Sequence, residues 1–154
     1  CRLLLEKTLA AGARVVRIPY QATAAELEQD YFAHINGVLL PGGGTNLEGQ
    51  FLASVETLVR LTEAANDAGD HFPVWGTCAG FEALAQIYAT PKIVGPMNAW
   101  NVSQTLDFYA AARTSAVYGY APALLATAAA EPVAMNNHHL GPSLLRAVFA
   151  PLRC

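Results

Sequence analysis

A single cysteine in the middle of the chain has neighbours that would prepare it for nucleophilic chemistry. Cys78 is the centre of a Gly-x-Cys-x-Gly sequence, which joins an apolar, β-forming run (72–75) to a helix-like run (81–88). A sharp turn from strand to helix exposes its central residue and needs small neighbours, here Gly76 and Gly80. Helix N-terminal N–H groups favour a thiolate and can bind a developing oxyanion. The pattern predicts a nucleophile elbow, although a free cysteine elsewhere usually packs as a small apolar side chain.

A glycine-rich loop follows an apolar run that reads as a buried strand, residues 37–41. Gly42, Gly43 and Gly44 come directly after it. Glycines let backbone N–H groups approach a ligand closely, which suits an oxyanion hole, but a flexible turn would use the same residues. The loop is neither a Walker A sequence nor a Gly-x-Gly-x-x-Gly sequence, so we do not expect it to bind a nucleotide phosphate.

Composition limits the classes of protein to consider. With 154 residues, 53% hydrophobic and 14% charged, the chain can form one folded domain over residues 1–154. Its net charge of −3 and lack of a basic cluster argue against nucleic acid, and no apolar run approaches the roughly 20 residues of a membrane span. Cys1, Cys78 and Cys154 have no metal-type spacing. We therefore expect a small-molecule partner and neither a metal nor another cofactor.

Helical and strand-like segments alternate along the first half of the chain. We expect helices over 2–11, 26–34, 51–67, 81–88 and 122–130, and strands over 14–18, 37–41, 72–75, 91–94 and 106–108. Such alternation predicts a parallel sheet with helices on both faces, with ligands bound at the carboxyl ends of the strands. The glycine loop and Cys78 would both lie at that edge. Phe72 and Trp75 are expected in the core of the sheet.

Two segments together resemble the gamma-glutamyl hydrolases, the folate polyglutamate peptidases of the class I glutamine amidotransferase-like superfamily. They are Ile35-Asn36-Gly37-Val38-Leu39-Leu40-Pro41-Gly42-Gly43 and Phe72-Pro73-Val74-Trp75-Gly76-Thr77-Cys78-Ala79-Gly80-Phe81-Glu82. The similarity extends from 11–16 to 135–141 and covers most of the chain. It implies an α/β fold with a three-layer α-β-α, flavodoxin-like arrangement, incomplete at both ends.

The resemblance also implies roles for individual residues. Cys78 matches the catalytic cysteine, which forms a thioester with the γ-linked carbonyl. The backbone N–H groups of Gly43 and Ala79 would form the oxyanion hole. His138 and Glu82 match residues beside the substrate, but His138 could instead be a structural loop residue, and Glu82 could face solvent or cap a neighbouring amide.

One element of the family pattern is missing from the sequence. The superfamily takes its general base from a histidine in a Trp-His-Pro-Glu-like segment, and no histidine of this chain is followed by Pro-Glu. The proton transfers of a thioester cycle require such a base. The chain also opens at Cys1 without a methionine. We expect a fragment of a longer enzyme, nearly inactive by itself.

The resemblance implies a folylpoly-γ-glutamate substrate, and it allows a homodimer, which is common in the family. It also implies a vacuolar, lysosomal or extracellular location. Asn101-Val102-Ser103 is an N-glycosylation sequon, which has meaning only in the secretory pathway and so agrees with that location. The sequence does not distinguish cleavage at the end of the glutamate tail from cleavage within it.

Two other functions stay open. The glutaminase subunit of an amidotransferase would use the same elbow on free glutamine, although its elbow usually continues with Gln or His where this chain has Phe81-Glu82. A non-enzymatic relative would instead use Cys78 as an oxidation sensor.

Overall fold

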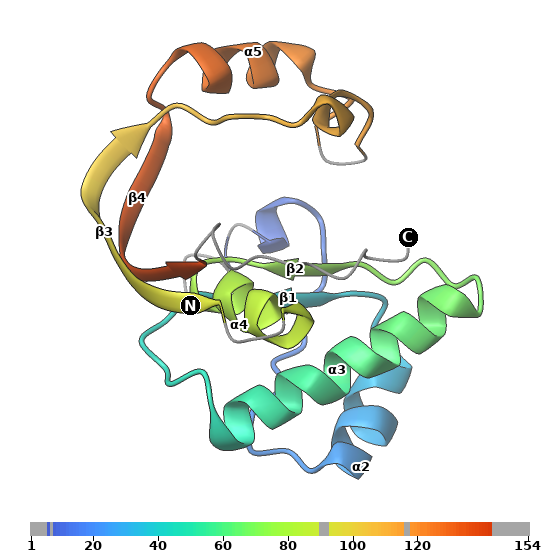
Figure 1. Ribbon diagram of the computed structural model, residues 1–154. Helices are drawn as coiled ribbons and strands as arrows, with labels where there is room; N and C mark the ends of the chain where they lie inside the picture. The colour runs from blue at the N-terminus through green and yellow to red at the C-terminus, as the bar shows by residue number, and fades with distance from the viewer. Residues whose placement is uncertain (1–5, 7, 90–92, 116–117, 143–154) are drawn as a thin grey trace. The chain divides into compact units, whose positions relative to one another are not determined.

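The computed structural model describes residues 6, 8–89, 93–115 and 118–142, and these form two compact units. Gly95–Gly141 make up the second unit. The described residues before Gly95, together with Pro142, make up the first. The chain is thus a mixed α/β protein with small sheets (Figure 1).

The first unit is built around a β-α-β arrangement. Strand β1 (Val38–Leu40) pairs in parallel with β2 (Val74–Gly76), with Val38 opposite Val74 and Leu40 opposite Gly76. Helix α3 (Gly49–Asp67) connects the two strands, and α4 (Ala79–Tyr88) follows β2 and contacts both strands and α3 (Figure 1). Parallel strands need a crossover of this kind, because a tight turn cannot join them.

The larger of two apolar clusters among the described residues of this unit surrounds α3 and β1. The inner face of α3 contributes buried Val55, Leu58 and Val59. They pack with Val38 and Leu40 of β1, and with Leu27, Phe72, Ala83 and Ala22. Full burial of a valine or leucine side chain contributes roughly 1.5–3 kcal/mol. The helix expected over 51–67 therefore contributes Val55, Leu58 and Val59 to this core.

The helical segment before β1 begins with a capping box. It comprises α2 (Ala24–Glu26), one π turn (Leu27–Tyr31) and one 3-10 turn (Phe32–His34). The Thr23 hydroxyl accepts from the Glu26 backbone N–H, and the Thr23 backbone N–H donates to the Glu26 carboxylate at 2.7 Å. The bond from the Thr23 N–H, and a second one that the Thr23 hydroxyl donates to the same carboxylate at 2.9 Å, lower the pKa of Glu26. The capping box also satisfies helix-end donors that have no intrahelical partner.

Asn66, near the end of α3, ties this helix to the segment that leads into β2. Its side-chain amide donates to the carbonyl oxygens of Thr62 and Phe72, both at 2.9 Å, and accepts from the Phe72 N–H at 3.1 Å. Phe72 is 3% exposed and stacks on Phe32 with ring centroids 4.3 Å apart. The sequence prediction that Phe72 lies in the core is confirmed.

A side-chain contact also joins α3 to α4. Tyr88 bonds to the Glu63 carboxylate, and burial, together with this bond, raises the pKa of Tyr88 to about 12. The phenol therefore stays neutral and can donate a hydrogen bond over the ordinary pH range.

The second unit is a paired ribbon with a helical cap. β3 (Val94–Gln104) pairs with β4 (Ala134–Pro142), and a 3-10 turn (Ala110–Thr114) and α5 (Pro122–Ala130) lie between them in the chain (Figure 1). The backbone N–H of Leu106 donates to the carbonyl of Ala128 at 2.8 Å and holds the segment after β3 against α5.

Most of the predicted elements are confirmed, and each unit contains one predicted strand that is wrong. Strands over 37–41 and 72–75 and helices over 26–34, 51–67, 81–88 and 122–130 are confirmed, with ends shifted by a few residues. The predicted strand over 14–18 is wrong: this segment is not a strand and pairs with no strand that the structure describes, and Val15 and Val16 are exposed. The predicted strand over 106–108 is also wrong, because Leu106 donates to α5 instead of to a strand.

Two predictions fall partly outside the described residues. Residues 2–5 and 7 of the predicted helix over 2–11 do so, whereas residues 6 and 8–10 are helical. Residues 91 and 92 of the predicted strand 91–94 also do so, and β3 begins at Val94. Among the helices that the structure describes, none is long and apolar enough to cross a membrane.

Candidate active site

Cys78 occupies a strained position between β2 and α4. Its backbone angles are φ 54° and ψ −119°, it is the N-cap residue of α4, and its side chain is exposed. Positive φ is rare for a residue other than glycine, and such strain costs on the order of 1–3 kcal/mol. The Thr77 N–H donates to the Leu40 carbonyl at 2.9 Å, so strand pairing continues up to the residue before the turn. The local geometry is that of the predicted elbow.

The two flanking glycines allow this turn to form. A Cβ on Gly76 would lie 2.7 Å from the Gly80 carbonyl carbon and from the Phe81 nitrogen. A Cβ on Gly80 would collide with the Leu40 carbonyl oxygen and lie 2.7 Å from the Leu40 Cβ. Real side chains essentially never approach so closely. The first turn of α4 can therefore rest directly on the ends of β1 and β2 only because both positions are glycine.

The glycine loop after β1 passes beside the cysteine. A Cβ on Gly42 would lie 2.8 Å from the Cys78 Cβ and 3.3 Å from its sulfur, whereas Gly43 and Gly44 have open space around them. The loop and Cys78 are thus at the same edge of the β1–β2 sheet, as the sequence predicted. The role of Gly43 as an oxyanion donor stays a prediction, and Gly42 is the residue in closest approach.

The start of α4 places a helix N-terminus at the cysteine. Ala79 is 3% exposed and is the first helical residue, while the Gly80 N–H donates to the Thr77 carbonyl and the Glu82 N–H to the Cys78 carbonyl, both at 3.0 Å. The positive end of the helix dipole therefore lies at residues 78–79. This field favours negative charge on an oxyanion bound there.

Glu82 lies one helical turn after Cys78 and is buried, with 9% of its surface exposed. The alternative that it simply faces solvent is therefore wrong. Its predicted place beside the substrate stays a prediction.

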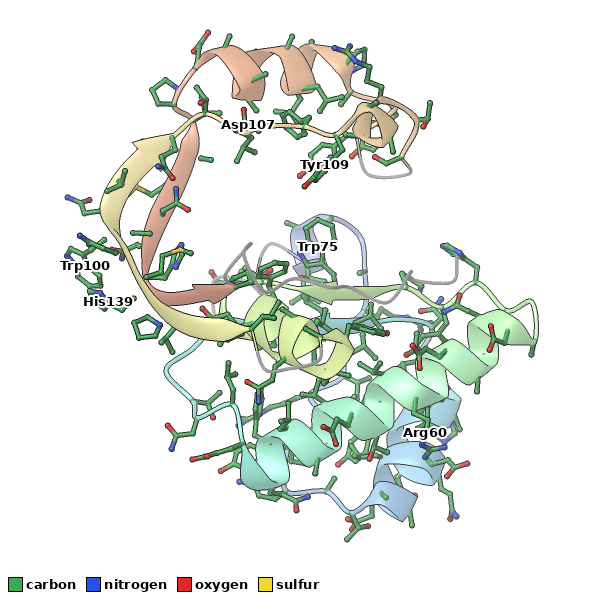
Figure 2. All side chains as sticks on the ribbon, viewed as in Figure 1. Arg60, Trp75, Trp100, Asp107, Tyr109 and His139 are labelled. Atoms are coloured by element: carbon green, nitrogen blue, oxygen red, sulfur yellow. The ribbon has the colours of Figure 1, made fainter. Side chains whose placement is uncertain are left out.

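Trp75 is not in the core, contrary to the sequence prediction. Its side chain is 51% exposed and stands clear of β2 (Figure 2). It pairs across the sheet with half-exposed Leu39, and its indole N–H donates to the Thr77 hydroxyl at 3.2 Å. Side chains alternate between the faces of a strand, so Trp75 lies opposite the face that packs on the helices. The same alternation, read from buried Phe72 onward, could have revealed this.

His138 lies in the second unit, on β4 and not in a loop. Its Nδ1 lies 2.6 Å from the Leu140 carbonyl oxygen, to which it donates, and its Nε2 lies 3.4 Å from the Asn136 side-chain oxygen. Its neighbour His139 stacks in parallel on Trp100, with ring centroids 4.5 Å apart (Figure 2). Successive residues of a strand face opposite sides, so the two histidines have different surroundings.

Asn101 lies on β3 with its side chain exposed and its backbone at φ 52°. Asparagine tolerates this left-handed conformation better than most residues. Ser103, the third residue of the sequon, is also exposed, and its hydroxyl lies 3.6 Å from the Met135 sulfur. Glycosylation of Asn101 stays a prediction, and the exposed sequon is sterically compatible with it.

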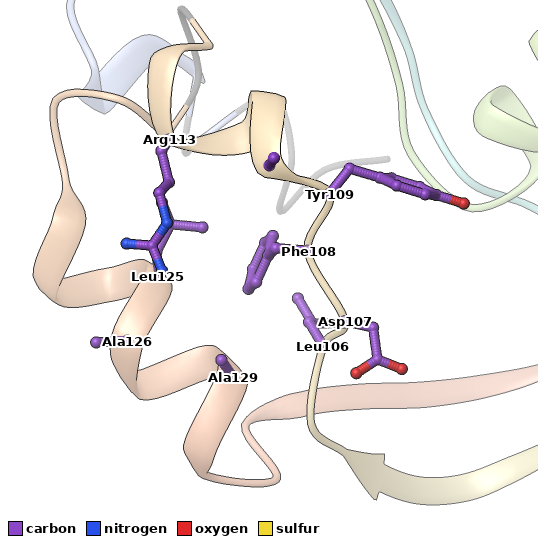
Figure 3. A pocket seen from close by; sticks show the side chains of 9 residues that line it. Leu106, Asp107, Phe108, Tyr109, Arg113, Leu125, Ala126 and Ala129 are labelled. Atoms are coloured by element: carbon purple, nitrogen blue, oxygen red, sulfur yellow. The ribbon is translucent and has the colours of Figure 1, made fainter.

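The second unit also contains an open pocket of about 250 Å³ between the segment after β3 and α5 (Figure 3). It is lined by Leu106, Asp107, Phe108, Tyr109, Ala110, Arg113, Leu125, Ala126 and Ala129. None of the predicted site residues is among them. Within the described part of the chain, no group of three His, Cys, Asp or Glu residues could hold a metal ion.

Comparison with known proteins gives a consistent set of relatives. No protein-family model matches the chain. A gamma-glutamyl hydrolase of Mus musculus is 39% identical over 130 residues, which are 83% of this chain and 41% of that protein. Gamma-glutamyl hydrolase B of Dictyostelium discoideum is 37% identical over 136 residues, 85% of this chain and 39% of that protein. A probable gamma-glutamyl hydrolase 3 of Arabidopsis thaliana is 33% identical over 133 residues, 84% and 37% respectively. The chain thus spans about two fifths of the length of these relatives.

Proposed function

This chain belongs to the gamma-glutamyl hydrolase family, and we propose that the complete gene product hydrolyses the γ-glutamyl bonds in the poly-γ-glutamate tails of folates. The observation that carries the proposal is the backbone of Cys78, at φ 54° between β2 and α4, with the sulfur exposed beside the glycine loop. Strain of this kind is found where a side chain must be presented for chemistry.

We propose the following reaction. The Cys78 thiolate attacks the γ-carbonyl carbon, and the carbonyl oxygen becomes an oxyanion stabilised by the N–H groups of Ala79 and Gly43. The carbon–nitrogen bond then breaks, the leaving amine takes a proton, and a thioester remains on Cys78. Water attacks the thioester, releasing a γ-carboxylate and restoring the thiol. Buried Ala79 at the start of α4 and the close approach of Gly42 to Cys78 support this assignment.

The remaining predicted residues have supporting roles in this proposal. Glu82 and His138 contact the glutamate tail, and neither a metal nor another cofactor takes part. The proton acceptor for Cys78 is a histidine other than His34, His71, His138 and His139, because none of these four precedes Pro-Glu. We accordingly propose that the 154 residues alone turn over substrate very slowly.

For the fold, we propose that both units belong to one domain of the three-layer, flavodoxin-like type. The parallel β1–β2 pair with its crossover helix α3 supports this, since such folds are built from repeated units of that kind. We also propose a vacuolar, lysosomal or extracellular location, supported by the exposed sequon at Asn101, and a homodimer. Size-exclusion chromatography with light scattering tests the dimer, and a monomeric mass would rule it out.

The decisive test is substitution of the nucleophile. Cys78→Ala in the complete gene product should lower release of glutamate from a folylpolyglutamate by at least about 10³-fold, because the covalent step is lost. Cys154→Ala is the matched control, and it should retain activity. Trapped wild-type enzyme should carry the folate side of the substrate on Cys78, as a thioester through its γ-carbonyl, and mass spectrometry can detect this adduct.

Two results would contradict the proposal. Retention of most activity by Cys78→Ala would remove Cys78 from the mechanism. Release of ammonia from free glutamine, without cleavage of folylpolyglutamate, would favour the glutaminase alternative.

A further inference from the structure

The glycine loop, residues 41–48, is held by described residues at both of its ends. At its start, the Leu40 carbonyl accepts from the Thr77 N–H, and Gly42 lies against Cys78. Residues 43–46, which follow, are all exposed. The backbone N–H groups of this stretch can serve an oxyanion only if the far end of the loop is also fixed.

Gln86 supplies that fixed point. Its side-chain nitrogen donates to the Leu47 carbonyl oxygen at 3.0 Å, across 39 positions of sequence. Gln86 is half-buried on α4, and the Leu47 side chain packs against the core cluster of the first unit. Gln86 follows Cys78 by eight residues, so the two lie about 12 Å apart along the helix axis. Helix α4 therefore carries the nucleophile at its start and the loop's anchor two turns later.

We propose that Gln86 is a positioning residue, which keeps the glycine loop aligned with Cys78 so that its N–H groups meet the oxyanion of the transition state. This inference rests on the proposed hydrolase function. Gln86 acts through the Leu47 carbonyl and does not touch the reacting atoms. Because preorganised donors act mainly on the transition state, loss of the anchor lowers kcat and leaves KM unchanged.

A second glutamine provides a matched control. The Gln50 side-chain nitrogen donates to the Ala22 carbonyl at 3.4 Å, across 28 positions, and to the Ser54 hydroxyl at 3.3 Å. It too joins a helix to a distant backbone carbonyl in the first unit, but it anchors the segment before α2 and not the glycine loop. Gln50→Met therefore removes a comparable bond without touching the loop.

The experiment compares Gln86→Met, Gln50→Met and Gln86→Lys in the complete gene product. Hydrogen exchange of residues 42–48, followed by mass spectrometry, should become faster in Gln86→Met only. Its kcat on a folylpolyglutamate should fall about fivefold, the value of one net hydrogen bond, with KM unchanged. Gln86→Lys restores a donor of similar reach and should recover both properties.

Unchanged loop exchange in Gln86→Met would overturn the proposal, and so would an equal loss of kcat in Gln50→Met. If the wild-type protein did not cleave folylpolyglutamate, the proposed function would fail. The exchange measurement would then still decide whether Gln86 anchors the loop.

Discussion

The two units of this chain differ in how far their large apolar side chains are buried. In the first, nine buried residues form one cluster beneath β1 and around α3. In the second, large apolar side chains stay exposed, among them Trp100 at 55%, Tyr109 at 86% and Tyr120 at 82%, while Ala99, Leu125 and Ala128 are the buried hydrophobic residues of its described part. Stability in the first unit thus comes from side-chain packing. The second relies more on backbone pairing of β3 with β4.

Truncating one leucine in each unit should give the largest difference in stability between the two units. Leu58 of α3 is 6% exposed, and Leu124 of α5 is 54% exposed. Leu58→Ala should lower the free energy of unfolding by about 3.5 kcal/mol, since it leaves a cavity as well as losing burial. Leu124→Ala should cost less than about 1 kcal/mol. Urea unfolding measures both, and equal losses would mean that the comparison is mistaken.

Substituting one glycine in each unit should give a smaller difference in stability, which arises close to the substituted residue. Gly80→Ala places a Cβ on the Leu40 backbone, so it should cost about 2 kcal/mol and lower hydrolase activity by shifting Cys78. A Cβ on Gly95 of β3 would have no neighbouring atom within 4 Å, and Gly95→Ala should change stability by less than about 0.5 kcal/mol. Thermal unfolding and a glutamate-release assay would follow the two variants. Full activity in Gly80→Ala would show that the elbow tolerates a side chain there.

The third contrast lies on the ribbon, at the sequon, where the expected change is in a glycan and only slightly in stability. In a secretory eukaryotic host, the protein should carry a glycan that peptide N-glycosidase removes, and Asn101→Gln should abolish it. Because Asn101 is exposed at φ 52°, the substitution should cost less than about 1 kcal/mol. Asn98→Gln, outside the sequon, is the control. A glycan that persists in Asn101→Gln, or is absent from the wild type, would contradict the assignment.

Secondary structure could be predicted from the sequence where the local residue pattern agrees with packing against a nearby core. Helix α3 could be predicted from the spacing of Val55 and Leu58. The elbow could be predicted from Gly76 and Gly80, where a Cβ would lie too close to the neighbouring backbone. Residues 14–18 have the composition of a strand, but no strand among the described residues pairs with them. Composition alone does not reveal whether a partner exists.

The ribbon of β3 and β4 shows the reverse case, a strand whose sequence does not resemble one. Strand β4 contains Asn136, Asn137, His138 and His139, residues that are uncommon in strands, so its polar sequence reads as a loop. Backbone pairing with β3 overrides this weak preference. In the site, too, features set by the local sequence could be predicted, as the surroundings of Cys78 show. The exposure of Trp75 and the bond from Gln86 to the loop depend on contacts between distant segments.

The closeness of Gly42 to Cys78 has a stereochemical consequence. Because a Cβ on Gly42 would lie only 2.8 Å from the Cys78 Cβ, the main chain closes one side of the cysteine. In the proposed mechanism, the substrate carbonyl would therefore approach from the other side. If its oxygen is directed to the Ala79 N–H, only one of the two faces of the planar amide can meet the sulfur. Every tetrahedral centre formed at this site would then have the same handedness, whichever glutamate of the tail is attacked.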